Sequence, residues 1–192
     1  MKTVSLRTAA ALAVSTLIVA CQSDAAGPGE LARATDFSTA AAPTCRGQVA
    51  TIYPGAPSLP AGASITPSGT GFAIQGTAGN DVIVGSNGDD VIQAGLGNDI
   101  ICALGGDDNV RAQAGNDQIE GGDGNDILDG DPGNDDIEGN AGNDLILGAH
   151  DNDTLRGGVG NDDIRGGPGT DSANGGQGTD TCDAESETRC EI

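Results

Sequence analysis

The sequence contains very few aromatic, histidine or lysine residues. It has no Trp, one Tyr, two Phe and one His among 192 residues, and its single lysine is Lys2. Residues 76–183 contain no aromatic residue, so this stretch offers no platform on which a base or a sugar ring could stack. The net charge of −21 argues against nucleic acid and anionic lipid as partners.

What the sequence has instead is a strict repeat rich in Gly and Asp. From Gly76 to Asp183 a nine-residue unit occurs twelve times without insertion or deletion. The fourth position is Gly in eleven repeats, Asp151 being the exception, and the eighth is Ile, Leu or Val in ten, with Ala173 and Cys182 as exceptions. A strict period of this kind predicts a solenoid. The sixth position is Asp in every repeat: Asp81, Asp90, Asp99, Asp108, Asp117, Asp126, Asp135, Asp144, Asp153, Asp162, Asp171 and Asp180.

Each unit divides into a turn and a short strand. Gly, Asn and Asp dominate the first six positions, and these residues accept the positive φ angles of turns. The last three positions carry one apolar side chain between two outward positions, as strand geometry requires. We therefore expect two parallel sheets, one from the odd-numbered and one from the even-numbered repeats. The entire core is expected to be Ile83, Ile92, Ile101, Val110, Ile119, Leu128, Ile137, Ile146, Leu155 and Ile164.

The row of carboxylates predicts a bound metal. Along each edge of the solenoid the sixth-position side chains stack about one strand spacing apart, roughly 4.8 Å, and each neighbouring pair repels by about 1 kcal/mol in water. Six carboxylates per edge leave five gaps on each of two edges, so one dication per gap gives about ten ions. The turns offer only oxygen donors, which suits Ca²⁺ better than Mg²⁺ or Zn²⁺. Without the metal, the same composition favours a disordered acidic tract.

This register resembles the RTX repeat, the haemolysin-type calcium-binding nonapeptide. The resemblance covers residues 76–183 and implies an all-β, right-handed parallel β-roll, in which six residues turn and bind calcium and three form a strand. It does not extend to toxin function, because RTX toxins use few cysteines and leave the cell through an uncleaved C-terminal signal.

Motifs of common enzymes do not occur in the sequence. His150 is the single histidine, and no nucleophile accompanies it at a fixed spacing. HExxH, GxSxG, paired CxxC and phosphate-loop motifs are absent. Carboxylate pairs abound, but a carboxylate that recurs in every repeat indicates a structural row rather than a glycosidase pair. We therefore predict that the protein is not an enzyme and has no catalytic residue.

The N-terminus predicts export. A basic start precedes the uncharged residues 8–20, which are too short to span a bilayer. The segment ending in Cys21 resembles a bacterial lipobox, which implies cleavage before Cys21 and lipid attachment to it. Gln22 then favours the outer membrane by analogy, so we expect a lipid-anchored protein of the bacterial cell envelope. An ordinary secretory signal with an incidental cysteine, and hence an extracellular protein, is the alternative.

If Cys21 carries lipid, four cysteines remain to form two disulfides in an oxidising compartment. Cys182 and Cys190 close a short C-terminal loop, which leaves Cys45 to pair with Cys102. The expected organisation is a signal peptide at 1–20, a flexible tether at 21–44, an N-terminal cap at 45–75, the β-roll at 76–183 and a disulfide cap at 184–192.

The N-terminal cap is expected to cover the first coil of the roll. It contains two short strand candidates, 48–53 and 71–74, around a loop at 54–69 that is rich in Pro, Gly and Ser. The Cys45–Cys102 bridge would place Val49, Ile52, Phe72 or Ile74 on an outward apolar patch of Val82, Val84, Ile100 and Cys102. On the opposite sheet Ile127, Leu145 and Leu147 stay uncovered, either as a surface for self-association or a protein partner, or as a harmless exposed cluster.

Two classes of function follow from these features. The first is an exported calcium-binding protein whose roll folds on Ca²⁺ and acts as a structural or adhesive surface module. The second is a calcium-folded accessory or targeting subunit of a separately encoded secreted enzyme. In either class we expect the turn at His150 and Asp151 to be the weakest calcium site, because Asp151 replaces a glycine at a left-handed position.

Overall fold

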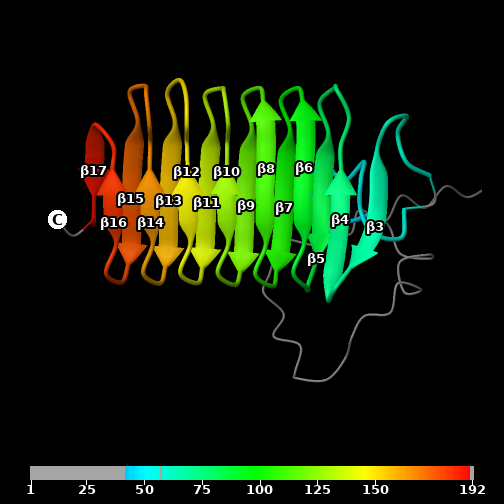
Figure 1. Cartoon of the computed structure of the whole chain (residues 1–192), viewed down its shortest axis with the longest axis horizontal. Helices are drawn as coiled ribbons and strands as arrows, with labels where there is room; N and C mark the ends of the chain where they lie inside the picture. Colours follow the sequence, from blue (N-terminus) through cyan, green and yellow to red (C-terminus); the bar gives the residue numbers. More distant parts are fainter. Residues whose placement is uncertain (1–41, 57, 191–192) are drawn as a thin grey trace, which may run out of the picture.

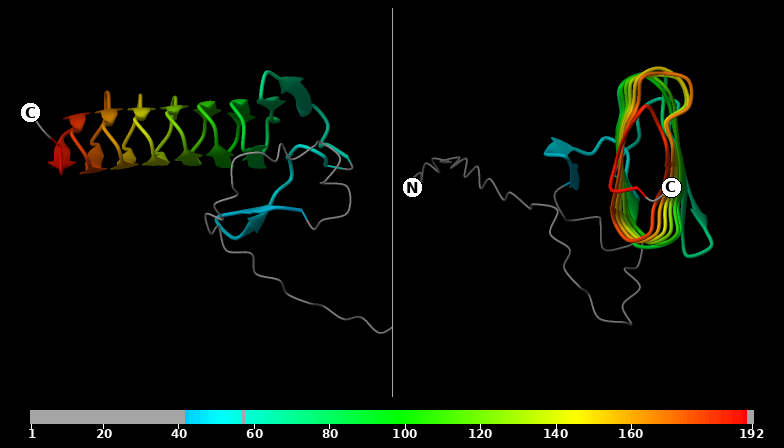
Figure 2. Two further views of the ribbon diagram at one scale, coloured as in Figure 1. Left: turned by 90° about the horizontal axis from the view of Figure 1, so that it is seen from below. Right: turned by 90° about the vertical axis from the view of Figure 1, so that its left-hand side faces the viewer.

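The computed structural model describes residues 42–56 and 58–190, and these form an all-β parallel solenoid of about six turns (Figure 1). Viewed along the axis, the coils superimpose as one flattened tube with a sheet on each broad side (Figure 2). The signal peptide, the lipid attachment at Cys21 and nearly all of the tether lie outside the described residues. No helix in the described ranges is long and apolar enough to cross a membrane.

The repeats alternate between the two sheets, as the period predicts. The odd sheet holds the odd-numbered repeats and one strand from the C-terminal tail: β5 (Val82–Ser86), β7 (Ile100–Gly105), β9 (Gln118–Asp123), β11 (Asp136–Ala141), β13 (Thr154–Val159), β15 (Ser172–Gln177) and β17 (Ser186–Thr188). The even sheet holds the even-numbered repeats and two strands of the cap: β3 (Ser64–Ser68), β4 (Gly71–Gln75), β6 (Val91–Leu96), β8 (Asn109–Ala114), β10 (Ile127–Asp129), β12 (Leu145–Leu147), β14 (Asp163–Arg165) and β16 (Thr181–Asp183).

The register places equivalent residues of successive coils side by side. Ile83 pairs with Ile101, and Ile101 with Ile119, so the eighth-position side chains form one inward row in each sheet. All ten predicted core residues are at most 1% exposed, which confirms them as core. They are not the entire core, because the inward row continues into the cap. Ile52 forms a parallel bridge with Ile83, and Ile74 pairs with Ile92, so both close the N-terminal end.

The cap contains more regular structure than its composition suggests. The loop predicted at 54–69 is wrong for residues 64–68, because these form β3, which pairs antiparallel with β4. The edge position explains how Pro67 is tolerated in a strand, since an edge strand needs no donor on its outer side. A separate short hairpin, β1 (Thr44–Cys45) and β2 (Gln48–Val49), stands against the outer face of the odd sheet (Figure 2).

The outward apolar patch is covered, but by different residues from those predicted. Cys45, Ala50 and Tyr53 form a second buried cluster with Val84 and Cys102. The predicted covering residues are placed elsewhere: Ile52 and Ile74 lie in the main core, Phe72 packs against it, and Val49 is 61% exposed. Ile52 continues the inward row beside Ile83, while Ala50 and Tyr53 on either side of it in the chain pack on the patch.

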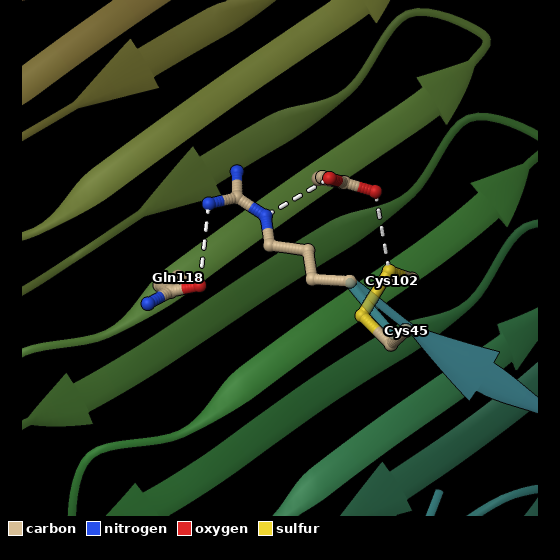
Figure 3. The surroundings of a disulfide bond; sticks show 5 residues. Cys45, Cys102 and Gln118 are labelled. Carbon is tan, nitrogen blue, oxygen red and sulfur yellow. Dashed lines mark hydrogen bonds and ion pairs between the residues drawn. A yellow bond between two sulfur atoms is a disulfide. The ribbon is translucent and has the colours of Figure 1, made fainter. Parts of the chain in front are cut away.

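Two anchors fix the β1–β2 hairpin to the roll (Figure 3). The first anchor is the disulfide between Cys45 and Cys102. At the C-terminal end of the roll, away from the hairpin, Cys182 is joined to Cys190. Both pairings are those expected from the sequence. Beside the first disulfide, the Arg46 guanidinium donates to Glu120 at 2.9 Å and to Asp136 at 2.8 Å.

The opposite apolar cluster is partly open to solvent. In the even sheet Ile127 lies next to Leu145 and is 43% exposed. Leu145 and Leu147 are half-buried, and the neighbours of Leu147 in the sheet are Asp129 and Arg165. The apolar surface is therefore a pair of adjacent side chains with a third residue set among charges.

Candidate metal sites

The sixth-position aspartates all lie inside the roll. Each occupies the last position of its turn, directly before the strand, and every one of the twelve is between 1% and 4% exposed. Turns of odd-numbered repeats form one edge of the flattened tube, the odd edge, and turns of even-numbered repeats form the other, the even edge. Each edge therefore buries a column of six carboxyl groups.

One oxygen of each carboxylate serves the backbone. The Asp99 Oδ1 accepts the N–H of Asp81 at 2.8 Å, and the Asp180 Oδ1 accepts the N–H of Asp162 at 3.0 Å. The same bond occurs ten times between sixth-position residues eighteen apart, at 2.7–3.0 Å. Ten of the twelve carboxylates thus bind the coil that precedes them.

The other oxygen is left without a partner in ten of the twelve repeats. A buried polar atom without a hydrogen bond costs roughly 1–3 kcal/mol, so a periodic set of such atoms points to a missing ligand. The ten buried Oδ2 atoms without a partner belong to Asp99, Asp108, Asp117, Asp126, Asp135, Asp144, Asp153, Asp162, Asp171 and Asp180.

Backbone carbonyls of the following coil converge on the same place. A Cβ added to Gly139 would touch the Asp144 Oδ2 and would lie 2.7 Å from the Gly157 carbonyl oxygen. The same pair of oxygens surrounds the first-position glycine of neighbouring turns, such as Gly121, where the carbonyl oxygen would be 2.9 Å away. An unpaired carboxylate oxygen beside carbonyl oxygens fits a hard, oxygen-liganded cation such as Ca²⁺.

The third, fourth and fifth repeats have alanine rather than glycine beside the unpaired Oδ2. Here the first position is Ala94, Ala103 and Ala112, and each is fully buried in the main core. Their methyl groups occupy the space that the glycine turns leave open, although the adjacent Oδ2 atoms still have no partner.

The first two repeats satisfy their aspartates internally. The Thr77 N–H and Oγ1 donate to the Asp81 Oδ2 at 2.7 and 2.9 Å. The Ser86 N–H donates to the Asp90 Oδ2 at 2.6 Å, and its Oγ lies 3.1 Å from the Oδ1. The sequence carried a signal for this difference that its periodicity concealed: only these two repeats have a hydroxyl residue at the second position.

Burial raises the pKa of nine of the sixth-position carboxyls. Desolvation is the largest cause, opposed by the backbone amide bond to each Oδ1, and it raises the pKa of Asp108 to about 8. It likewise raises the pKa to about 7 for Asp99, Asp135 and Asp144, and to about 6 for Asp117, Asp126 and Asp153. The pKa of Asp90 and of Asp162 is raised for the same first cause. A bound cation would reverse this preference for the protonated form.

The turn at Asp151 is the irregular one, as the sequence predicts. Asp151 has φ of 77°, whereas the fourth-position glycines with positive φ lie between 109° and 151°. His150 is exposed beside it. Asp153 nevertheless has an Oδ2 without a partner, as in the regular turns, although the backbone at Asp151 is strained.

No cluster of three or more His, Cys, Asp or Glu side chains suited to a metal occurs in the described part of the chain. A metal ion held in these turns would have to combine single carboxylates with backbone carbonyls. Such a donor set is visible in a sequence only through its repetition.

The comparisons agree with this geometry. The family model of the RTX calcium-binding nonapeptide repeat matches the chain in four copies, over residues 75–110, 103–137, 129–164 and 157–186. No curated protein matches the chain. Repeats of this family bind calcium ions, and the matches span more than half of the sequence. A parallel roll with a buried carboxylate in each of twelve turns, matched by that model over residues 75–186, belongs to the family of RTX calcium-binding repeat proteins.

Proposed function

We propose that the roll is a calcium-dependent structural module of an exported protein, with one ion at each buried Oδ2 that lacks a partner. The observation that carries this proposal is the set of ten such atoms in a calcium-binding family, six of them beside an inward carbonyl oxygen at a first-position glycine. The number of proposed ions equals the ten gaps between repeats that the sequence predicts, but no ion is assigned to the carboxylates of the first two repeats. The amides of Asp81 and Asp90 donate to Asp99 and Asp108, while their own Oδ2 atoms already accept bonds from Thr77 and Ser86.

Calcium would couple binding to folding in this arrangement. The interior ions would neutralise columns of carboxylates that otherwise repel one another and resist ionisation. Because the unfolded chain offers no preformed site, the binding free energy becomes folding free energy. The roll would therefore be a calcium-responsive element, ordered where calcium is abundant.

Export and a lipid anchor complete the proposal. Both disulfides support an oxidising compartment, because such bonds are rare in the cytosol. The proposed anchor at Cys21 would tether the roll to the bacterial cell envelope. We assign the module a structural or adhesive role there, with Ile127 and Leu145 as the contact surface for a second copy or a protein partner. A sedimentation comparison of Leu145→Asp with the wild type tests that contact.

The ion count tests the main proposal. Native mass spectrometry of residues 22–192 in calcium should show ten ions for the wild type and nine for Asp144→Asn, whose Oδ2 lies beside the Gly157 carbonyl in a glycine turn. Asp81→Asn is the matched control: it also removes one sixth-position charge, but in a turn closed by Thr77, so the count should stay at ten. A wild type that binds no calcium would refute the function. Equal losses in the two variants would refute the exclusion of the first turns.

A further inference from the structure

The C-terminal tail continues the roll beyond the twelfth repeat. β17 pairs parallel with β15, and Ser186 lies opposite Ser172 (Figure 1). Glu185 therefore lies opposite Asp171, at the place that a sixth-position Asp takes in every complete coil. The spacing is fourteen residues rather than eighteen, so the tail reaches this place through a shortened turn.

On the odd edge Glu185 makes the bond that defines the ladder. Its Oε2 accepts the N–H of Asp171 at 2.8 Å, as each sixth-position Oδ1 accepts the N–H of the preceding coil. Asp171 is 1% exposed, and its Oδ2 is buried without a partner. The last carboxylate of this edge thus faces a second carboxylate supplied by the tail.

On the even edge a carbonyl of the tail replaces that of a following coil. A Cβ added to Gly175 would lie 2.5 Å from the Asp180 Oδ2 and would also touch the Arg189 carbonyl oxygen. At Gly157, inside the roll, the corresponding oxygens are the Asp162 Oδ2 and the Gly175 carbonyl. Asp180 is 1% exposed and its Oδ2 has no partner.

The disulfide holds this tail carbonyl in place. Arg189 has φ of 53°, which turns the chain back toward the roll, and the next residue, Cys190, is bonded to Cys182 of β16. The tail is therefore fixed to the last even strand immediately after the carbonyl that faces Asp180.

We infer that residues 184–190 complete one terminal calcium site on each edge, with Glu185 as the carboxylate beside Asp171 and the Arg189 carbonyl as the oxygen beside Asp180. This inference rests on the proposed calcium function. Eight of the ten unpaired Oδ2 atoms face another repeat, and these two face the tail. If the tail were a plain end cap, the roll would finish on two buried carboxylate oxygens without any partner.

Glu185→Gln tests the odd edge. It keeps an oxygen for the Asp171 amide but removes the charge, so the calcium count should fall from ten to nine. Asp183→Asn is the control, because it removes one exposed charge from β16, next to the same tail. A Glu185→Gln variant that binds as many ions as Asp183→Asn, with the same affinities, would overturn the odd-edge site.

Cys182→Ala combined with Cys190→Ser tests the even edge. Ala173 already fills the eighth position of the eleventh repeat at 1% exposure, so alanine at 182 suits the core. The count should fall by one while circular dichroism in calcium stays unchanged. Asp180→Asn should remove the same single ion even if the double variant loosens the last coil. A wild-type count of eight that neither tail variant alters would overturn both terminal sites and leave the calcium-binding roll intact.

Discussion

At the scale of the residue, each interior aspartate has two separate tasks. Its Oδ1 accepts the amide of the coil before it, and its Oδ2 has no partner and is the atom that we propose as a calcium ligand. Asparagine would keep an acceptor but lose the charge, and alanine would lose both. The conformation of the turn then decides how well the second task is performed.

Asp151 is the residue whose replacement should stabilise the roll. At φ of 77° an Asp is strained where glycine is not. We expect Asp151→Gly to raise the free energy of unfolding in calcium by about 0.5–1 kcal/mol, measured by urea denaturation. Gly142→Asp, in the regular turn before it, is the reciprocal control and should lower that free energy. A loss of stability in Asp151→Gly would show that the aspartate contributes more than its backbone costs.

Removal of a regular sixth-position side chain should cost more than removal of the irregular one. Asp126→Ala eliminates the acceptor for the Asp108 amide and one proposed ligand in a glycine-lined turn. Asp153→Ala removes the same groups next to strained Asp151. We expect Asp126→Ala to lower the free energy of unfolding in calcium by roughly 1–3 kcal/mol. Asp153→Ala should lower it by less. The measurement is urea denaturation of both variants at a series of calcium concentrations. Equal decreases in the free energy of unfolding would show that all turns are equivalent.

At the scale of the element, the β1–β2 hairpin straps the cap to three odd repeats. Cys45 is bonded to the third repeat, and Arg46 reaches Glu120 of the fifth and Asp136 of the seventh. Desolvation alone would raise the pKa of Asp136, but hydrogen bonds from Arg46 and Arg156 lower it overall. A solenoid has contacts only between adjacent coils unless such a strap spans them.

Arg46→Ala should weaken this strap. The Arg46 side chain is only 19% exposed and its guanidinium bridges two carboxylates, so we expect the free energy of unfolding to fall by about 1 kcal/mol and amide exchange in β9 and β11 to become faster. Arg165→Ala is the matched control, because Arg165 pairs only with the exposed Asp163 of its own strand. Identical exchange in the two variants would indicate that the disulfide alone holds the hairpin.

The sequence predicted the repeats well and the cap poorly, for one physical reason. In the roll every inference was tested twelve times by the period, so the row of Ile83 to Ile164 and the alternation of sheets could be predicted. The cap occurs once. Nothing in residues 50–53 says that Ile52 extends the inward row while Tyr53 covers Cys102. The bonds that Thr77 and Glu185 make to sixth-position aspartates were missed because Thr77 stands at a variable position of the repeat and Glu185 lies beyond the twelfth repeat.

At the scale of the whole molecule, the fold without calcium is destabilised by its buried carboxyl groups, and its core has few large apolar side chains to offset them. We expect the calcium-free protein at neutral pH to be largely unfolded and to fold cooperatively on addition of Ca²⁺. Far-UV circular dichroism with and without EGTA measures this, with disulfides reduced in a parallel sample. A β spectrum unchanged by EGTA in the reduced protein would contradict it.

The raised pKa values give the calcium-free protein an unusual pH dependence. Burial raises the pKa of seven interior carboxyls from 3.8 to about 6–8 in the fold, so folding takes up protons. The destabilisation is absent below about pH 4, grows as pH rises, and is complete above about pH 8. In calcium-free buffer we therefore expect more β structure at pH 5 than at pH 8, with the trend abolished by calcium. More β structure at pH 8 would contradict the burial of these groups.

The pairing of each Oδ1 with the coil before it gives the roll a direction. The amide of Asp81 finds its hydrogen-bond acceptor only when the coil that carries Asp99 has folded. The same holds for each later coil, up to the Asp171 amide, whose acceptor is Glu185. A chain that emerges N-terminus first can thus be wound behind its own cap one coil at a time, each new turn locking the last. The tail forms the last of these hydrogen bonds on the odd edge, so the winding of the roll ends with it.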